Sequence, residues 1–461
     1  MAAQNYVLLE RVTVGEAGAS SITFNSIPQT GYTDLKIVMS VRKIDATTLS
    51  SSYLKFNGSS TGYSYRRIYG NGSGAYSDTN VTGTASMYLG SSNSATSTAN
   101  TFSSAEIYIP NYASANNKSV SVEMVQEDNA TAGYQFMIAG LWSNTAAITS
   151  MAITGDANYV QYSTFSLYGL AAVGTTPTKA PKATGGSIIQ TDGTYWYHAF
   201  LASGTFTPAV GLSCDYLVVA GGGGAGDMSG GGAGGLRSTV TATGGGGSLE
   251  SAISVSAQAY TITVGAGGAG VNAGATVGTI GSNSVFSTIT STGGGYGGGY
   301  GPNTPAVGNG GNGGSGGGSI ANTTGGTPGT GTANQGFGGS GKANAVFGQG
   351  GGGGGAGAAP TVIGNGSGDN GGIGVAISAF ATATSTGVSN YYAGGGAGSS
   401  QAGYAQGIGG SGGGGNGRVQ NGASATSGTA NTGGGGGGTY FTNGLPSGAG
   451  GSGIVIIRYA V

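Results

Sequence analysis

Charge is the scarcest property of this 461-residue sequence. Only 6% of the residues are charged, the formal net charge is −1, and Asp and Glu outnumber Lys and Arg by 15 to 14. Nucleic-acid binding depends mainly on phosphate contacts made by a basic surface. The composition therefore argues against a nucleic-acid partner and against any partner recognised chiefly by charge.

Histidine and cysteine are nearly absent, with one residue of each, His198 and Cys214. A single cysteine cannot close an intrachain disulfide, which fits synthesis in a reducing cytoplasm. An imidazole-based triad or a multi-histidine metal site would depend on His198 alone. His198 lies in an aromatic segment, where we expect a packed or surface residue. We predict no catalytic residue, no metal and no cofactor.

Long apolar runs and export signals are also missing. No apolar run approaches the roughly 18–20 residues that cross a bilayer, so we expect no membrane insertion. The first residues lead directly into Tyr6–Glu10 without the basic and long apolar regions of a signal peptide. For that reason a bacterial surface adhesin is the less favoured interpretation.

Alternating polarity marks the first part of the chain. Leu35, Ile37, Met39 and Val41 fall on one face of an extended segment, and similar short alternations recur up to Phe165–Leu167. Turn signals such as Asn57-Gly58 separate these segments, and no 3.6-residue period competes with them. We predict an all-β fold with little or no α-helix, in which residues 1–170 form a β-sandwich or jelly roll for virion attachment or assembly.

A second architecture follows a polar, non-periodic linker that we place at residues 171–186. Of the 105 glycines, 85 lie after residue 220. Strand-like segments at 195–200 and 216–220 precede the glycine runs, and the segment 453–459 closes the chain. We expect these strands to frame a glycine-rich domain, residues 187–461, whose two ends return to one small sheet.

Glycine-rich sequence is usually flexible linker, and that is the first interpretation to weigh. Here, however, segments containing Ile, Val, Phe or Tyr follow the glycine clusters, and strand-like segments at 260–264 and 284–290 lie between them. A solvated coil also usually carries more charge than the three basic and three acidic residues between positions 221 and 453. These features favour a folded domain.

A folded glycine region must compensate for conformational entropy. Ordering a glycine in regular structure costs roughly 0.5–1 kcal/mol more than ordering alanine. Without Cβ atoms, extended polyproline-II segments can approach closely and exchange N–H···O bonds, each worth about 1 kcal/mol net. We therefore predict that the glycine runs form polyglycine-II helices packed side by side and framed by short strands.

Three segments carry a resemblance to a known family: Tyr216–Gly226, Tyr260–Gly270 and Gly450–Tyr459. Each joins a strand to a glycine run, and together they resemble the glycine-rich domain of phage tail-fibre and virion proteins. The likeness covers about residues 190–461. More distantly, the chain resembles the fibre-tip adhesins of T-even phages, which implies a layered sandwich of polyglycine-II helices with receptor-binding loops at one end. The N-terminal sandwich is a departure from those adhesins.

Two glycine motifs suggest nucleotide binding but lack its context. Val218–Gly226 contains a GxGxxG-like pattern, yet more glycine follows where a helix should bind pyrophosphate. Gly336–Ala343 nearly spells a P-loop, but Ala343 stands where Ser or Thr should ligate magnesium. We interpret both as coincidences of composition.

The acidic cluster Glu123, Glu127 and Asp128 could in principle serve a polysaccharide depolymerase. It is more simply interpreted as the solvated edge of a strand.

Aromatic residues between the glycine runs are the better candidates for recognition, because they supply contact area and stack on sugars. The alternative is that they fill the edges of a lattice without a side-chain core. The candidate receptor-binding residues are Tyr296, Tyr300, Phe337, Tyr391, Tyr392, Tyr404, Tyr440 and Phe441.

We therefore expect a non-enzymatic virion protein, a phage fibre or adhesin made in the host cytoplasm. Its expected partners are other virion proteins and a host-cell surface receptor, either a glycan or an outer-membrane protein. Homo-oligomerisation, with a trimer favoured, is implied by the resemblance alone. The alternative is a structural capsid fibre or decoration protein without a receptor role.

Overall fold

The computed structural model describes residues 6–25, 27–78, 81–129, 133–172, 180–271, 276–300, 308–320, 326–342, 349–364, 366–440 and 445–461. The chain divides into two compact units. Unit 1 comprises Met1–Lys182, Ser187–Trp196 and Ala460–Val461, and unit 2 comprises Ala183–Gly186 and Tyr197–Tyr459. Within the expected linker, residues 173–179 lie outside the description.

Unit 1 is built from antiparallel strands in two sheets. One sheet has the order β15-β1-β13-β3-β9-β10-β11-β5-β6, with β7 also beside β5, and the other has the order β2-β12-β4-β8. The strands are β1 (Tyr6–Thr13), β2 (Ala19–Phe24), β3 (Tyr32–Val41), β4 (Leu49–Phe56), β5 (Tyr63–Gly70), β6 (Ala75–Ser77), β7 (Val81–Thr84), β8 (Met87–Asn93), β9 (Ser103–Ile109), β10 (Lys118–Gln126), β11 (Tyr134–Trp142), β12 (Met151–Tyr159), β13 (Thr164–Ala171) and β15 (Ile188–Thr191).

The sandwich core follows from the alternation in the sequence. Buried and exposed residues alternate without a break along β10, and the predicted inward face of β3, from Leu35 to Val41, is buried. Aromatic side chains join the two sheets, with the rings of Phe56 in β4 and Trp142 in β11 5.4 Å apart. One contiguous apolar core therefore stabilises this unit.

Unit 2 begins and ends in one antiparallel sheet of order β19-β18-β28-β16, which we call the base. Its strands are β16 (Tyr195–Phe200), β18 (Leu212–Val219), β19 (Leu236–Ser238) and β28 (Ile454–Ala460). Val219, just before the first glycine run, pairs with Ile454, just after the last. The prediction that both ends of the glycine-rich region return to one sheet is confirmed by the pairing of β18 with β28.

Further short strands complete unit 2. A second sheet has the order β14-β17-β21-β22-β23, β20 pairs with β18, and two small pairs are β24 with β25 and β26 with β27. Their bounds are β14 (Ala183–Thr184), β17 (Gly204–Pro208), β20 (Ile253–Val255), β21 (Tyr260–Thr263), β22 (Ser284–Phe286), β23 (Ile289–Ser291), β24 (Ser319–Ile320), β25 (Gly341–Lys342), β26 (Val375–Ala376) and β27 (Tyr391–Tyr392). The single strand expected at 284–290 is instead a hairpin, because Ser287 turns the chain at φ 53°.

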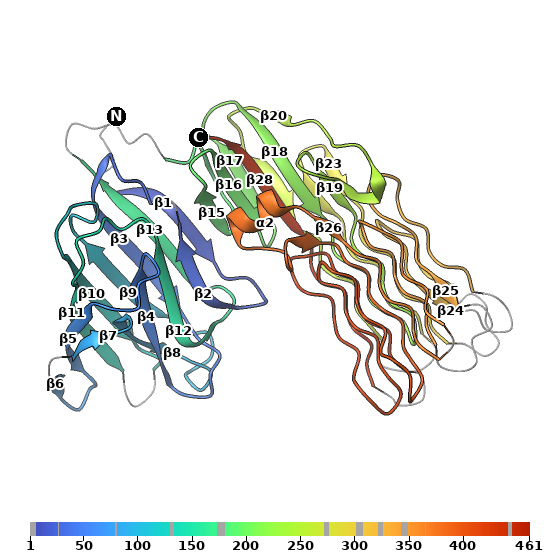
Figure 1. Ribbon diagram of the computed structural model, residues 1–461, viewed down its shortest axis with the longest axis horizontal. Coiled ribbons are helices and arrows are strands. Elements are labelled where there is room, and N and C mark those ends of the chain that lie inside the picture. Colours follow the sequence, from blue (N-terminus) through green and yellow to red (C-terminus); the bar gives the residue numbers. More distant parts are fainter. Residues whose placement is uncertain are drawn as a thin grey trace. The chain divides into compact units, whose positions relative to one another are not determined.

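The first glycine run, residues 220–227, has a three-residue hydrogen-bond period. Every third N–H donates to the same neighbouring segment, and the runs lie side by side in Figure 1. The donors Ala220, Gly223 and Gly226 reach residues 229–235, the donors Gly221, Gly224 and Asp227 reach residues 276–282, and the donors Gly222 and Ala225 reach residues 448–451. This period is that of a polyproline-II spiral, which has no internal hydrogen bonds.

The carbonyl groups of this run accept hydrogen bonds from further segments. The oxygens of Gly221, Gly222 and Gly223 accept from Gly294, Gly268 and Gly436, which belong to three other segments. The second run, residues 229–235, likewise donates to three segments and accepts from three. Six neighbours therefore surround each run, and every residue from Ala220 to Gly235 is buried. The predicted polyglycine-II sandwich framed by short strands is confirmed, and the fold is all-β.

Close backbone approach explains why these positions are glycine. A Cβ added to Gly223 would lie far inside 3.0 Å of the carbonyl oxygen of Gly295, and Gly224 faces Ala269 in the same way. No glycine in the first two runs has a positive φ, as the left-handed spiral requires. Glycine is therefore required in these runs because there is no room for a Cβ atom, and not because the backbone has a positive φ.

Helical structure with described bounds is limited to a 3₁₀ turn at Gly244–Gly246 and the seven-residue helix α2 (Ser378–Thr384). Phe380 of α2 packs against Tyr197 of β16 and lies under the guanidinium of Arg458 of β28. The helix thus lies at the base. In the described part of the chain, no helix has the length and hydropathy to span a membrane.

Candidate functional site

The end of the glycine runs opposite the base is the candidate site, and we call it the distal end. It is marked by the turn Asp227–Ser229 between the first two runs, about 22 Å along the first run from Ala220 at 3.1 Å per residue. The carbonyl oxygen of Met228 accepts from Ser399 N at 2.8 Å, and Met228 bridges to Gly299. Several runs therefore end together here.

Three candidate aromatic residues lie at or close to this end. Tyr300 follows Gly299 and is half-buried. Tyr404 follows the segment 399–400, is 50% exposed and covers Gly366. Tyr440 follows Gly438, is only 3% exposed, and has its pKa raised by burial. Tyr404 thus offers the most accessible ring of the three.

The other described candidates lie elsewhere. Tyr296 is half-buried within a run, where its ring covers Gly311. Tyr391 and Tyr392 form β27, and the buried Tyr392 hydroxyl lies 2.7 Å from the Thr386 hydroxyl just after α2. Phe337 is half-buried beside Gly246. These residues fill edges of the lattice, and Phe441 lies outside the described residues.

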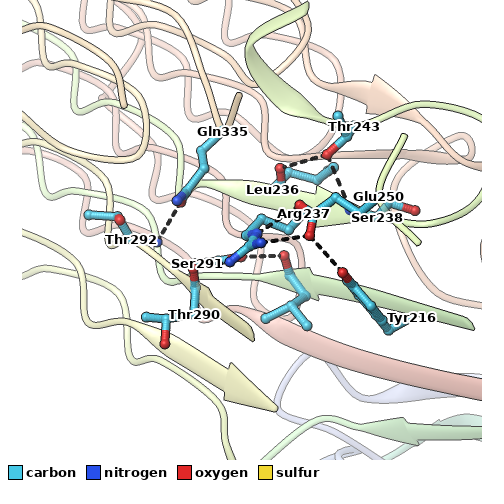
Figure 2. Close-up of polar contacts among 11 residues, drawn as sticks. Tyr216, Leu236, Arg237, Ser238, Thr243, Glu250, Thr290, Ser291, Thr292 and Gln335 are labelled. Carbon is cyan, nitrogen blue, oxygen red and sulfur yellow. Dashed lines mark hydrogen bonds and ion pairs between the residues drawn. The ribbon is translucent and has the colours of Figure 1, made fainter. Parts of the chain in front are cut away.

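A polar cluster fastens the base, where Tyr216 and Arg237 both point at the carboxylate of Glu250 (Figure 2). Arg237 donates from Nε and Nη2 at 2.7 and 2.6 Å, and the Tyr216 hydroxyl donates at 2.6 Å. Burial acts to raise the pKa of Glu250, but these hydrogen bonds and the guanidinium charge hold that pKa below its usual value. The cluster ties β18 and β19 to the segment 249–250.

Polar side chains also stabilise the start of the glycine run at residues 293–299, next to this cluster (Figure 2). Gln335 Oε1 accepts from Thr292 N at 2.8 Å, and Ser291 Oγ donates to Val218 O at 2.8 Å. Each contact satisfies a backbone group where a strand gives way to a glycine run. Like the carboxylate cluster, these contacts stabilise the base rather than expose reactive groups.

Lys342, from the near P-loop, has a structural partner. Its ammonium lies 2.7 Å from Asp369 Oδ1, and both side chains are almost fully buried. The same ammonium donates to Ile363 O, and Ser340 Oγ donates to Asp369 Oδ2 at 2.7 Å. The glycines around it join the lattice, just as those of the GxGxxG-like pattern do in the first run. A phosphate-binding helix follows neither segment among the described residues.

His198 is packed, which is one of the two environments expected for it. It is 0% exposed, its Nδ1 lies 2.6 Å from Gly185 O, and its Nε2 lies 2.9 Å from the Tyr459 hydroxyl. Burial lowers the pKa of the imidazole to about 4, although the Gly185 contact acts in the opposite direction. His198 is therefore neutral at pH 7 and has no access to a substrate.

Arg418 is the residue that the sequence interpretation passed over. Its N–H donates to Gly438 O and its carbonyl accepts from Ser400 N, both at 2.8 Å, which places it at the distal end. The side chain is 5% exposed, and its Nε has no acceptor among the described residues. The sequence could have pointed to Arg418 only through a comparison of the few basic and acidic residues of the glycine-rich region.

In the described part of the chain, no group of three or more His, Cys, Asp or Glu residues could hold a metal ion.

Comparison with known proteins identifies the second half of the chain. A family model described as a glycine-rich domain matches residues 201–460. No curated protein matches the chain, and no solved structure matches it. The matched range begins in the segment after β16 and ends with β28, so it takes in the whole lattice together with the strands that close it.

Proposed function

The chain belongs to the glycine-rich domain family, and on that premise we propose that it is a phage fibre or adhesin protein whose distal end binds a host-surface receptor. The observation that carries the proposal is that each of the first two runs is hydrogen-bonded to six neighbouring segments. Such a lattice holds its end loops rigidly while contributing few side chains itself. Variable recognition residues are then confined to loops at its ends.

The likeness of the glycine segments to those of phage tail-fibre and virion proteins supports the same proposal. In this assignment unit 1 attaches the protein to other virion proteins, and the assembled particle carries it as a homo-oligomer, a trimer by resemblance. Several copies raise the overall avidity of a weak single contact. The protein would be made in the host cytoplasm and released in the virion.

We propose no catalytic activity. Three of the four carboxylates between residues 197 and 459, those of Asp215, Glu250 and Asp369, are held in ion pairs. A glycoside hydrolase needs two carboxyl groups free to act as acid and as base or nucleophile. These pairings therefore argue against a depolymerase site in unit 2.

The proposal is tested by comparing two tyrosines at opposite ends of the lattice. Tyr404→Ala removes an exposed ring at the distal end, and Tyr391→Ala removes a half-buried ring near α2 as the matched control. We expect reduced adsorption of purified protein to host cells for Tyr404→Ala and unchanged adsorption for Tyr391→Ala. Wild-type protein that fails to adsorb, or particles that need the protein only for assembly, would favour the structural fibre or decoration role.

A further inference from the structure

The outer face of one sheet of unit 1 carries large apolar side chains at exposed positions. Met137 and Leu141 of β11 are 61% and 37% exposed, Ile68 of the neighbouring β5 is 60% exposed, and Val125 of β10 is 38% exposed. Along β10 and β11 these positions alternate with buried residues, so their side chains point away from the sandwich core. Packing of the core therefore does not explain why they are apolar.

The strand register makes these side chains one continuous patch. Met137 pairs directly with Ile68, and the exposed Ala139 lies between Met137 and Leu141 on the same face of β11. Directly opposite side chains of an antiparallel pair have Cβ atoms about 4.5–5.5 Å apart. A contiguous exposed apolar patch is typical of a protein–protein interaction site. We call the following five side chains the outer patch: Ile68, Val125, Met137, Ala139 and Leu141.

Two charged side chains beside the outer patch, Arg66 and Glu123, form no ion pair with any described residue. Glu123 accepts a hydrogen bond from Gln135 Nε2 at 3.2 Å. Glu106, directly opposite Glu123 on β9, is paired with Lys36 at 2.7 Å. Like charges directly opposite one another destabilise a sheet. A cation supplied by another molecule would therefore stabilise Glu123, and an anion would pair with Arg66.

We propose that a second copy of this chain packs on the outer patch in a twofold dimer. Arg66 on β5 and Glu123 on β10 lie on opposite sides of β11, where they pair with Ala139 and Met137 respectively. In a twofold contact the same patch of both copies meets, so that residue i contacts j and j contacts i. An axis parallel to the face, passing between Met137 and Ala139, places Arg66 of each copy over Glu123 of the other. The two charges then pair twice around an apolar centre.

This arrangement has the anatomy of a protein interface, with an apolar centre and a polar rim. Ser121 of β10 and Ser64 of β5 border the outer patch on its two sides. Self-pairing of unit 1 goes beyond the receptor role proposed for the distal end and does not depend on it. A twofold contact closes as a dimer, whereas the trimer implied by the resemblance would need a head-to-tail contact through other surfaces.

Sedimentation equilibrium of the full chain over a range of concentrations tests the dimer. We expect wild type to show a reversible monomer–dimer equilibrium. Met137→Lys and Ile68→Lys each place a charge at the apolar centre, and each should weaken dimerisation about 10-fold or more. Ile44→Lys is the matched control, because Ile44 is 65% exposed but lies between β3 and β4, beside Asn158 of the other sheet. It should leave dimerisation unchanged.

A charge exchange tests the twofold geometry itself. Glu123→Arg sets two arginines against each other across the contact, and Arg66→Glu sets two glutamates, so each single variant should weaken dimerisation about 10-fold. The double variant Arg66→Glu/Glu123→Arg restores opposite charges and should recover dimerisation. A double variant that dimerises no better than the single ones would overturn the pairing of Arg66 with Glu123.

Thermal unfolding keeps these results interpretable, because substitutions on an exposed face should leave the unfolding temperature near that of wild type. Wild-type protein that stays monomeric at every concentration would overturn the proposal and leave the outer patch to a different protein. A dimer that Met137→Lys and Ile68→Lys both leave intact would also overturn it. Tyr404→Ala, which tests receptor binding, should not change dimerisation, so that either proposal can fail while the other stands.

Discussion

The N–H of Gly223 donates to the carbonyl oxygen of Gly232 at 2.8 Å, and the N–H of Gly232 continues the chain of bonds to Gly295 at 2.8 Å. Three segments are thus joined at one level through peptide groups alone. The absence of side chains is what allows this spacing, and the stability of unit 2 should depend on it.

Gly223→Ala tests that dependence. The added methyl group would overlap the carbonyl oxygen of Gly295 in a site with no room to relax, so we expect a loss of about 3 kcal/mol or more, at the upper end of overpacking effects. Gly364→Ala is the control, because a Cβ there meets nothing within 4 Å. Urea unfolding of both variants measures the difference. A Gly223→Ala protein as stable as Gly364→Ala would contradict the lattice.

The sequence was sufficient to predict the class of fold but not which segments of the glycine-rich region pair with one another. Alternation along β3 and the closing strands β18 and β28 are predictable, because apolar side chains record their environment. The partners of a glycine run cannot be predicted in this way. Gly222 bonds to Gly451 and Gly231 to Gly436 across long separations in the sequence, and a run of identical residues does not indicate which residue pairs with which. Composition could show that the runs fold, whereas which runs become neighbours depends on how all the runs of the domain are arranged.

The same limit applies to the candidate site. Tyr391 and Tyr404 stand in similar loop sequence between glycine clusters, yet one lies near α2 and the other at the distal end. The order of runs in the lattice determines which loop lies at which end, and the local sequence around each loop does not indicate that order.

Glu250→Gln tests the carboxylate cluster at the base. Because the folded pKa of Glu250 is lowered, its ionised form stabilises the fold above its unfolded pKa near 4.3, and this contribution disappears as pH falls through the folded value. We expect Glu250→Gln to be less stable than wild type at pH 7 and the difference to shrink at acid pH. Urea midpoints measured from pH 7 to pH 3 give the comparison. A difference independent of pH would show that the charge of Glu250 is not the cause.

His198 offers a pH test with a single reporter, because the chain has no other histidine. Its folded pKa of about 4 lies below the unfolded value near 6.5, so the fold binds fewer protons and loses stability as pH falls from about 6.5 to about 4. The loss is on the order of 3 kcal/mol. We expect His198→Gln to lack this part of the pH dependence. Proton NMR of the native imidazole should show no titration above about pH 5, and titration near 6.5 would contradict its burial.

Lys342 and Asp369 allow a test of the buried ion pair inside the lattice. Lys342→Met leaves the fully buried Asp369 carboxylate without its cation, and breaking such a pair typically costs about 3–5 kcal/mol. Removing both charges in Lys342→Met/Asp369→Leu should recover much of that loss, because no unpaired charge remains. Ser340 and Ile363 N would still lose an acceptor, so recovery should be incomplete. A double variant less stable than Lys342→Met would instead show that the hydrogen bonds to Asp369, rather than the neutralisation of its charge, stabilise this part of the lattice.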